Sequence, residues 1–321
     1  MELKPTADRM PKLGAVRLPD PRTVAAFAIA AVLLLLAAAP GRARAADPVI
    51  AAAGDIACDR LPANANTCQQ LATSDLVFGH PLAAVLALGD NQYERGELAN
   101  FQQFYDPTWG RFKSITRPAL GNHEYLTPGA AGYFQYFGAT AAPPNGWYSY
   151  DIGAWHLIVL NSNCAAAGGC TSSSPQGQWL KSDLARNISK SCTLAYWHMP
   201  HFSSGALGDD DAGQNPTLGF WNLLYNAGAD VVLGGHDHDY ERFGLQDPDG
   251  EPAPAFGIRE FVVGTGGKSH HTFAATAGNS QIRNNTAYGV LRLTLHPSGY
   301  DWQFLPAAGS SFTDSGSTAC H

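Results

Sequence analysis

Charged residues are scarce in this sequence: they make up 15% of its 321 residues, whereas apolar residues make up 45%. So little charge argues against a disordered chain, and the apolar content is enough for a sizeable core. The formal net charge is −7, and an acidic surface disfavours nucleic acid as a partner. No internal repeat and no long linker interrupts the sequence, so we expect a single catalytic domain.

An apolar run long enough to span a membrane is missing near the N-terminus. Residues 24–39 are apolar throughout, but this run of sixteen falls short of the ~20 that a transmembrane helix needs. A leader with five Lys or Arg residues precedes it, Pro40 and Gly41 end it, and Ala43-Arg44-Ala45 fits a signal-peptide cleavage site. We predict a cleaved signal over residues 1–45, an exported protein and no stable membrane anchor.

Cys-x-x-Cys spacings, which are typical of zinc sites, are also absent. All six cysteines follow residue 45, and an even number in an exported chain indicates disulfides. Short loops favour Cys58–Cys68 and Cys164–Cys170. That leaves Cys192–Cys320 to hold residues 306–321, a Gly/Ser/Ala-rich segment that we expect to be a tail behind a catalytic domain of residues 46–305.

Apolar runs of strand type and helical patterns first alternate along the chain. Strands are predicted at 49–53, 83–88, 116–120, 192–197, 230–233 and 258–263, and helices at 66–78, 97–105, 176–187 and 218–226. Hairpins are predicted at 147–160 and 288–305. This order predicts an α/β (α+β mixed) domain in which helices flank mixed sheets. His156, within an apolar strand, is expected to be a hydrogen-bonded core residue.

Metal-ligand side chains gather in five short loops, each of which follows an apolar run where one can be identified. Loops at the carboxyl ends of strands are where open α/β sheets place their chemistry, so these five are expected to converge. They contain Asp55 (54–57), Asp90 and Tyr93 (89–93), Asn122 and His123 (121–124), His198 and His201 (198–201), and His236 and His238 (235–238).

The residue types in these loops divide into two ligand sets that share a carboxylate. Asp90 is placed to bridge two ions, the arrangement that clamps both oxygens of a phosphoryl transfer. Asp55, Tyr93 and one histidine make a hard, oxygen-rich set. Asn122, His198 and the other histidine make a nitrogen-rich set, suited to zinc, iron or manganese. The rings of His236 and His238, two apart on an extended segment, face the same way and can serve one ion each.

Three further features are candidates for contact with the substrate. His123, next to Asn122, is placed to reach a leaving-group oxygen as a general acid. His201 and the glycine loop 264–267 are candidate phosphate contacts. Lys268, His270 and His271, which follow that loop, are weaker candidates.

These motifs resemble those of the calcineurin-like metallophosphoesterases, and among them the purple acid phosphatases. The superfamily's first motif usually reads D-x-H, whereas here Asp55 is followed by Ile56 and Ala57. Purple acid phosphatases lack that histidine and carry G-D-x-x-Y in the second motif, as residues 89–93 do. Residues 121–124 and 235–242 resemble the family's later motifs.

The resemblance implies a four-layer αββα sandwich of two mixed sheets flanked by helices. It also implies two metal ions. Iron(III) would be held by Asp55, Asp90, Tyr93 and His238, and iron(II), zinc(II) or manganese(II) by Asp90, Asn122, His198 and His236. His123 would be the substrate-binding acid. A metal-bound hydroxide would attack phosphorus directly, without a covalent enzyme intermediate.

The function that this resemblance implies is hydrolysis of small phosphomonoesters by an exported dinuclear-metal phosphatase. The family's pair of substrate-binding histidines downstream of the His198 position is not evident, and His201 lies nearer in sequence than that pair. Two other functions stay open: a phosphodiesterase or nucleotide hydrolase with the same metals, and a non-catalytic module that captures phosphate.

Overall fold

The computed structural model describes residues 46–60, 68–207 and 216–321, and residues 47–321 form one compact unit. The predicted signal peptide lies outside the described residues. Within the described ranges, no helix is both long and apolar enough to cross a membrane.

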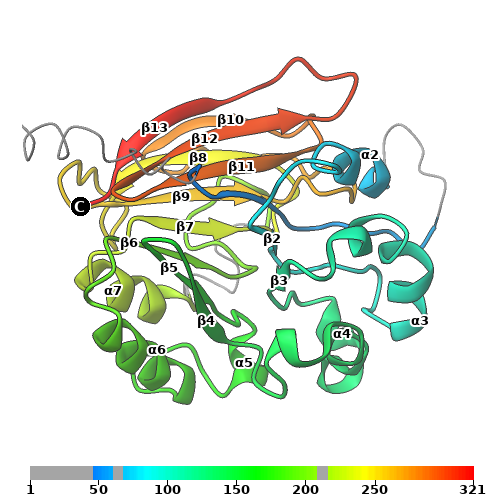
Figure 1. The fold of residues 1–321 in the computed structure, drawn as a ribbon, viewed down its shortest axis with the longest axis horizontal. Helices are drawn as coiled ribbons and strands as arrows, with labels where there is room; N and C mark the ends of the chain where they lie inside the picture. The colour runs from blue at the N-terminus through cyan, green and yellow to red at the C-terminus, as the bar shows by residue number, and fades with distance from the viewer. Residues whose placement is uncertain (1–45, 61–67, 208–215) are drawn as a thin grey trace, which may run out of the picture. The chain divides into compact units, whose positions relative to one another are not determined.

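Two mixed β-sheets form the framework of the unit (Figure 1). The six-stranded sheet consists, in spatial order, of β13 (Ser315–Ala319), β12 (Gly299–Pro306), β11 (Gly289–His296), β1 (Val49–Ala53), β2 (Ala84–Ala87) and β3 (Thr116–Pro118). The seven-stranded sheet consists of β10 (Ser280–Asn284), β8 (Tyr240–Gln246), β9 (Ile258–Val263), β7 (Val231–Gly234), β6 (Cys192–Tyr196), β5 (Trp155–Val159) and β4 (Tyr148–Ile152).

Each sheet combines a parallel part with antiparallel edges. Strands β1, β2 and β3 are parallel, as are β5, β6, β7 and β9, while the remaining neighbours pair antiparallel. The carboxyl ends of the parallel strands therefore share one edge within each sheet. The prediction of mixed sheets flanked by helices is confirmed.

Alternation along the strands of the second sheet decides which layer each side chain enters. Leu157 and Leu194 belong to the apolar core that also contains Ile50 of the first sheet. Their neighbours Ile158 and Ala195 pack instead with helices α6 (Pro175–Arg186) and α7 (Leu218–Asn226). Strands that are apolar on both faces are typical of a sheet covered on both sides. In Figure 1 the two helices lie beside β4, β5 and β6, at the lower left of the view.

The helices follow from local sequence signals. In α6, Pro175 occupies the first turn, where its missing N–H costs nothing, and the Ser174 hydroxyl accepts a hydrogen bond from the Gly177 N–H at 3.2 Å. The other α-helices are short: α2 (Gln70–Asp75), α3 (Leu98–Asn100), α4 (Ala131–Phe137) and α5 (Cys164–Ala167). The predicted helix start at residue 66 lies outside the described residues.

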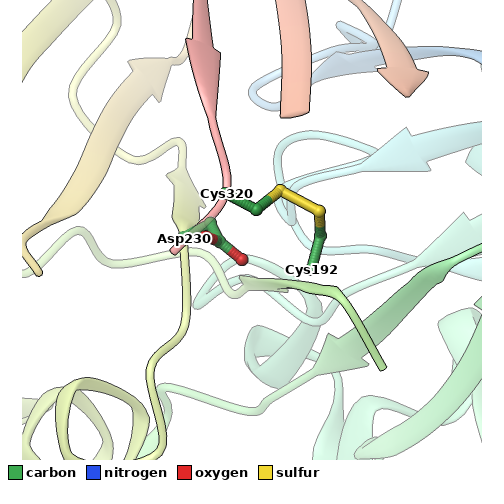
Figure 2. Close-up of side chains that lie close together, drawn as sticks. All are labelled: Cys192, Asp230 and Cys320. Atoms are coloured by element: carbon green, nitrogen blue, oxygen red, sulfur yellow. A yellow bond between two sulfur atoms is a disulfide. The ribbon is translucent and has the colours of Figure 1, made fainter. Parts of the chain in front are cut away.

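The three predicted disulfides, Cys58–Cys68, Cys164–Cys170 and Cys192–Cys320, are all present. The last one joins the start of β6 to the end of β13, and Asp230 lies beside it (Figure 2). The expected tail is not loose: β13 pairs with β12 and extends the first sheet beyond residue 305. The disulfide therefore ties the two sheets to each other.

Removal of Cys192–Cys320 is expected to destabilise the protein more than removal of Cys164–Cys170. The sequence separations are 128 and 6 residues, and loop-closure entropy then predicts losses of about 5 and about 2 kcal/mol. Paired Cys→Ala variants compared by denaturant unfolding test this order. Equal losses would show that loop length does not govern the effect.

His156 is confirmed as a hydrogen-bonded core residue. Its Nδ1 lies 2.9 Å from Asp151 Oδ1 of β4, and its Nε2 lies 2.7 Å from Asp183 Oδ2 of α6. Burial acts to lower the pKa of His156, but the hydrogen bonds to Asp183 and Asp151 raise it above its usual range. Only the imidazolium form donates from both nitrogens, so the folded protein favours the charged ring.

His156→Gln is expected to lower the free energy of unfolding by about 1–3 kcal/mol at pH 5.5, with a smaller loss at pH 8.5. Because the folded pKa is raised, this stabilisation is fully present below the unfolded value of about 6.5 and is lost as pH rises through the folded value. Denaturant unfolding at both pH values measures it. The exposed His80, which lies outside the strands and helices, provides the control His80→Gln, whose effect should be small at both pH values. An equal loss at both pH values would contradict the charged state.

Candidate metal centre

The five predicted loops meet where the parallel strands of both sheets end. Backbone hydrogen bonds join neighbouring loops within each sheet, from Asp55 N to Gly89 O at 3.1 Å and from Gly235 N to His198 O at 2.8 Å. The two sheets are joined at the same place, since the His236 N–H donates to Asp55 Oδ2 at 2.8 Å.

Close approach of these loops depends on glycine. A Cβ on Gly121 would lie 2.0 Å from Asp90 Oδ1, and one on Gly89 would lie 2.6 Å from His198 Cβ. Gly89 also has a φ of +88°, which an L side chain rarely adopts. The glycines that precede Asp90 and Asn122 are therefore part of the architecture of the site.

The first cluster of ligand atoms surrounds the Tyr93 hydroxyl. Tyr93 Oη lies 2.8 Å from Asp55 Oδ1, 3.0 Å from Asp90 Oδ2 and 2.9 Å from His238 Nε2. Asp55 Oδ1 and His238 Nε2 are 3.3 Å apart. These are the four residues predicted for the oxygen-rich set.

The second cluster surrounds His198 Nε2. This atom lies 3.0 Å from Asn122 Oδ1, 3.3 Å from Asp90 Oδ2 and 3.3 Å from His236 Nδ1. Asp90 Oδ2 therefore belongs to both clusters. Metal–ligand bonds of about 2.0–2.2 Å at right angles put neighbouring ligand atoms about 3 Å apart, which matches the spacing within each cluster.

The outer nitrogens of two histidines show which atoms face inward. His198 Nδ1 lies 3.0 Å from the Leu88 carbonyl oxygen, and His238 Nδ1 contacts the Ser269 carbonyl oxygen. A carbonyl only accepts, so each Nδ1 donates and each Nε2 directs its lone pair at carboxylate oxygens when the ring is neutral. Histidines that bind metals are commonly oriented in this way, so the donor set fits a pair of cations.

The charges of the cluster also favour the binding of cations. Burial acts to raise the pKa values of Asp55 and Asp90, but the neighbouring histidines lower both below their usual range. Burial acts to lower the pKa of His198, but the Asp90 and Asp55 carboxylates raise it to about 10. Burial and the charge on His198 lower the pKa of His236 to about 4. Two ionised, buried carboxylates thus attract positive charge.

Three of the candidate ligands have a strained backbone. Asp55, Asp90 and His236 adopt positive φ angles of 58°, 46° and 69°. Left-handed conformations cost non-glycine residues about 1–2 kcal/mol each and concentrate at functional sites. The surrounding loops maintain these conformations, which aim the three side chains at the cluster.

Glu124 supports the site in a way that the sequence motifs did not reveal. Its buried carboxylate accepts backbone hydrogen bonds from Asp90 (3.1 Å), Asn91 (2.8 Å), Gln92 (3.3 Å) and Gly121 (2.7 Å). It therefore fixes the Asp90 loop and the Asn122 loop together. Burial and the Asp90 charge raise its pKa to about 8, against these backbone donors.

A cavity of about 290 Å³ opens onto the cluster. His123 lines it, with Nε2 3.8 Å from Asp90 Oδ2 and Nδ1 2.5 Å from the Glu94 carbonyl oxygen. Lys268 and His271 also line it; the Lys268 ammonium pairs with the Glu94 carboxylate, and His271 stacks on His238 with ring centroids 3.7 Å apart. Two of the weaker candidates thus lie at the site.

Of the described residues that line this cavity, none is His201. Its side chain is 2% exposed and stacks on Trp221, with ring centroids 4.8 Å apart. Its backbone N–H donates to Glu260 Oε1 at 2.8 Å, which holds the loop and turns the ring into the core beside α7. The expected phosphate contact from His201 is therefore corrected: of the later polar residues, Lys268 and His271 reach the cavity instead.

The glycine loop 264–267 supports the cavity from behind. Gly266 N donates to Gly54 O at 2.9 Å, and Gly54 N donates to Val263 O at 2.9 Å, so the loop lies against the Asp55 segment. Lys268 N then donates to Asp55 O at 2.9 Å. The loop thereby positions Lys268, whose side chain supplies the cationic wall of the cavity.

The calcineurin-like phosphoesterase family model matches residues 48–240, more than half of the chain. The chain belongs to this family. The predicted resemblance is thereby confirmed, and the matched range contains every residue of both ligand clusters.

Several curated relatives are acid phosphatases. Purple acid phosphatase 15 of Arabidopsis thaliana is 29% identical over 204 residues, which cover 53% of this chain and 37% of that protein. Acid phosphatase type 7 of Homo sapiens is 27% identical over 182 residues, which cover 50% of this chain and 40% of that protein. The chain thus spans about two fifths of the length of these relatives.

Solved structures share the fold. A purple acid phosphatase from yellow lupin (Lupinus luteus) seeds superimposes with a TM-score of 0.66 at 18% identity, covering 85% of this chain and 53% of that one. GAP50 of Plasmodium, described as the anchor in the inner membrane complex, has a TM-score of 0.62 at 13% identity, covering 86% and 90%.

Proposed function

We propose that the protein is an exported, dinuclear-metal phosphatase that hydrolyses small phosphomonoesters. The observation that carries this proposal is Asp90 Oδ2, a carboxylate oxygen shared by two clusters of inward-facing ligand atoms. Acid phosphatase relatives and the family match support the reaction class. Three disulfides support export, because such bonds persist in oxidising compartments.

In this proposal, Asp55, Asp90, Tyr93 and His238 hold iron(III), since hard anionic oxygen ligands suit a highly charged ion. Asp90, Asn122, His198 and His236 hold iron(II), zinc(II) or manganese(II). When bound, the two ions would supply positive charge to the phosphoryl oxygens and make a water molecule more acidic.

Residues of the chain bind the ester and supply the proton that the leaving alcohol takes up. Hydrolysis breaks the bond between phosphorus and the alcohol oxygen and forms a bond between phosphorus and the oxygen of water. The alcohol oxygen takes up a proton, which His123 Nε2 is placed to donate, because Nδ1 is engaged with the Glu94 carbonyl. The Lys268 ammonium, in the same cavity, attracts the phosphate.

A reconstitution experiment tests the function. Metal-free protein is supplied with iron, zinc or manganese and assayed on 4-nitrophenyl phosphate and bis(4-nitrophenyl) phosphate. Preference for the monoester supports the proposal, and preference for the diester would make the protein a phosphodiesterase. Stoichiometric binding of inorganic phosphate without turnover of either ester would indicate a non-catalytic phosphate-binding module.

A further inference from the structure

A second cavity, of about 320 Å³, adjoins the candidate metal cavity. Asn122 lines both cavities, and Met199, which directly follows His198, lies in the wall of the second. A phosphate that lies in the metal cavity therefore places its organic group close to the second cavity.

The two cavities differ in chemistry. Glu94, Lys268 and histidines line the metal cavity. No charged residue is found among the described residues that line the second cavity, where Leu126, Met199 and the ring of Tyr125 supply apolar surface. The pair of cavities is thus charged at one end and apolar at the other, as an ester of an apolar alcohol is.

Three of the polar side chains that line the second cavity already have hydrogen-bond partners within the protein. Ser162 Oγ accepts from Met199 N at 3.0 Å, Asn163 Nδ2 donates to Asn161 Oδ1 at 3.1 Å, and Tyr125 Oη accepts from Asn161 Nδ2 at 2.8 Å. An apolar group that enters the cavity leaves these three hydrogen bonds in place, which favours its burial.

Helix α5 forms one wall of the second cavity and is held in place. Ala165 and Ala166 of this helix line the cavity, and the Cys164–Cys170 disulfide joins the start of the helix to the segment that follows it. A wall that is fixed before binding costs less to order when a ligand enters. Small alanine side chains also leave room for a flat ring.

We propose that this second cavity binds the alcohol portion of the substrate and selects phosphomonoesters of flat, apolar alcohols, such as aryl phosphates. This inference rests on the proposed function and adds its substrate class. An apolar cavity of about 150 Å³ takes up a benzene ring, so 320 Å³ accommodates one or two fused rings.

Competing esters test the selectivity on the metal-loaded protein. The value of kcat/KM for benzyl phosphate divided by that for methyl phosphate is expected to exceed 10, because the two leaving alcohols are similarly acidic and only the benzyl ester buries a flat apolar group. Leu126→Ser removes part of the wall, and Ala166→Trp fills the cavity; each is expected to lower this ratio about three- to tenfold. Leu71→Ser is the matched control, since Leu71 and Leu126 are 45% and 46% exposed and Leu71 lies on α2.

Binding of phosphonates, which are not hydrolysed, separates this inference from the proposed function. Calorimetry is expected to show tighter binding of phenylphosphonate than of methylphosphonate, with the difference lost in Leu126→Ser. If that pattern appears but no ester is hydrolysed, the subsite stands and the phosphatase function is wrong. Equal binding of the two phosphonates, or an unchanged kcat/KM ratio in both variants, overturns the subsite even if hydrolysis is observed.

Discussion

Asp90→Asn is expected to lower kcat by at least about a hundredfold and to reduce metal content at both positions. Asp90 Oδ2 lies 3.0 Å from Tyr93 Oη in one cluster and 3.3 Å from His198 Nε2 in the other. An amide has the same shape but lacks the negative charge, and its NH₂ group cannot act as a ligand. Kinetics on 4-nitrophenyl phosphate and metal analysis of the purified variant measure both effects.

A surface carboxylate provides the control for this substitution. Asp75, whose side chain is 56% exposed, pairs with Arg111 at 2.7 Å and lies on α2, outside the ligand loops, so Asp75→Asn should keep normal rates and metal content. If Asp90→Asn retained two metal ions per chain and near-normal rates, Asp90 would not bridge the site, and the two-metal assignment would be wrong.

Much of the site could be predicted because each ligand stands at a fixed place in a local pattern. Asp55, Asp90 and His198 follow buried apolar strands, and polar side chains at strand ends converge whenever the strands are parallel. The strand at 49–53 and the helix at 218–226 even have the predicted bounds. Local periodicity is most informative where burial is complete on a strand or confined to one face of a helix.

Residues whose roles depend on distant partners were harder to predict. His201 lies three residues after His198, yet its ring turns toward Trp221 because Glu260 holds the backbone of its loop. Glu124 orients two loops through backbone N–H groups, and no spacing in the sequence reveals where those groups point. Closeness to a ligand in the sequence therefore did not reveal that the His201 ring lies in the core, and it did not reveal that Glu124 orients the site.

Some antiparallel strands of the two sheets were also missed. Strand β13 consists of Ser, Gly, Thr and Ala residues, so its pairing with β12 leaves no apolar alternation in the sequence. Strand β8 begins directly after the His238 motif and contains the charged residues Glu241 and Arg242. Charged residues are not typical of a buried strand, so the sequence did not predict this one. Glu241 is buried because Ser204 N and Ser204 Oγ donate to its carboxylate. Hydrogen bonds that compensate for a buried charge depend on the fold, and the strand propensity of the residues does not predict them.

Tyr93→Phe is expected to remove the visible colour of the iron-loaded protein while the fold is kept. The side chain is 1% exposed, and its Oη lies within 3.0 Å of an atom from each of Asp55, Asp90 and His238. A phenolate bound to iron(III) absorbs visible light by ligand-to-metal charge transfer, so the wild-type protein should be pink to violet. Phenylalanine retains the ring and its packing but lacks the oxygen, so the absorption band should disappear completely.

The same substitution is expected to move the pH optimum of hydrolysis upward. Loss of the phenolate removes the hard anionic ligand that favours iron(III) over iron(II), and water at a site that then holds the less highly charged iron(II) is less acidic. Tyr133→Phe is the matched control, because Tyr133 is fully buried but donates to the Pro118 carbonyl at 2.9 Å, so colour and pH optimum should not change. A colourless iron-loaded wild type, or a band that survives in Tyr93→Phe, would exclude Tyr93 as a ligand. The first site would then consist of Asp55, Asp90 and His238, as in a two-metal phosphoesterase without the purple chromophore.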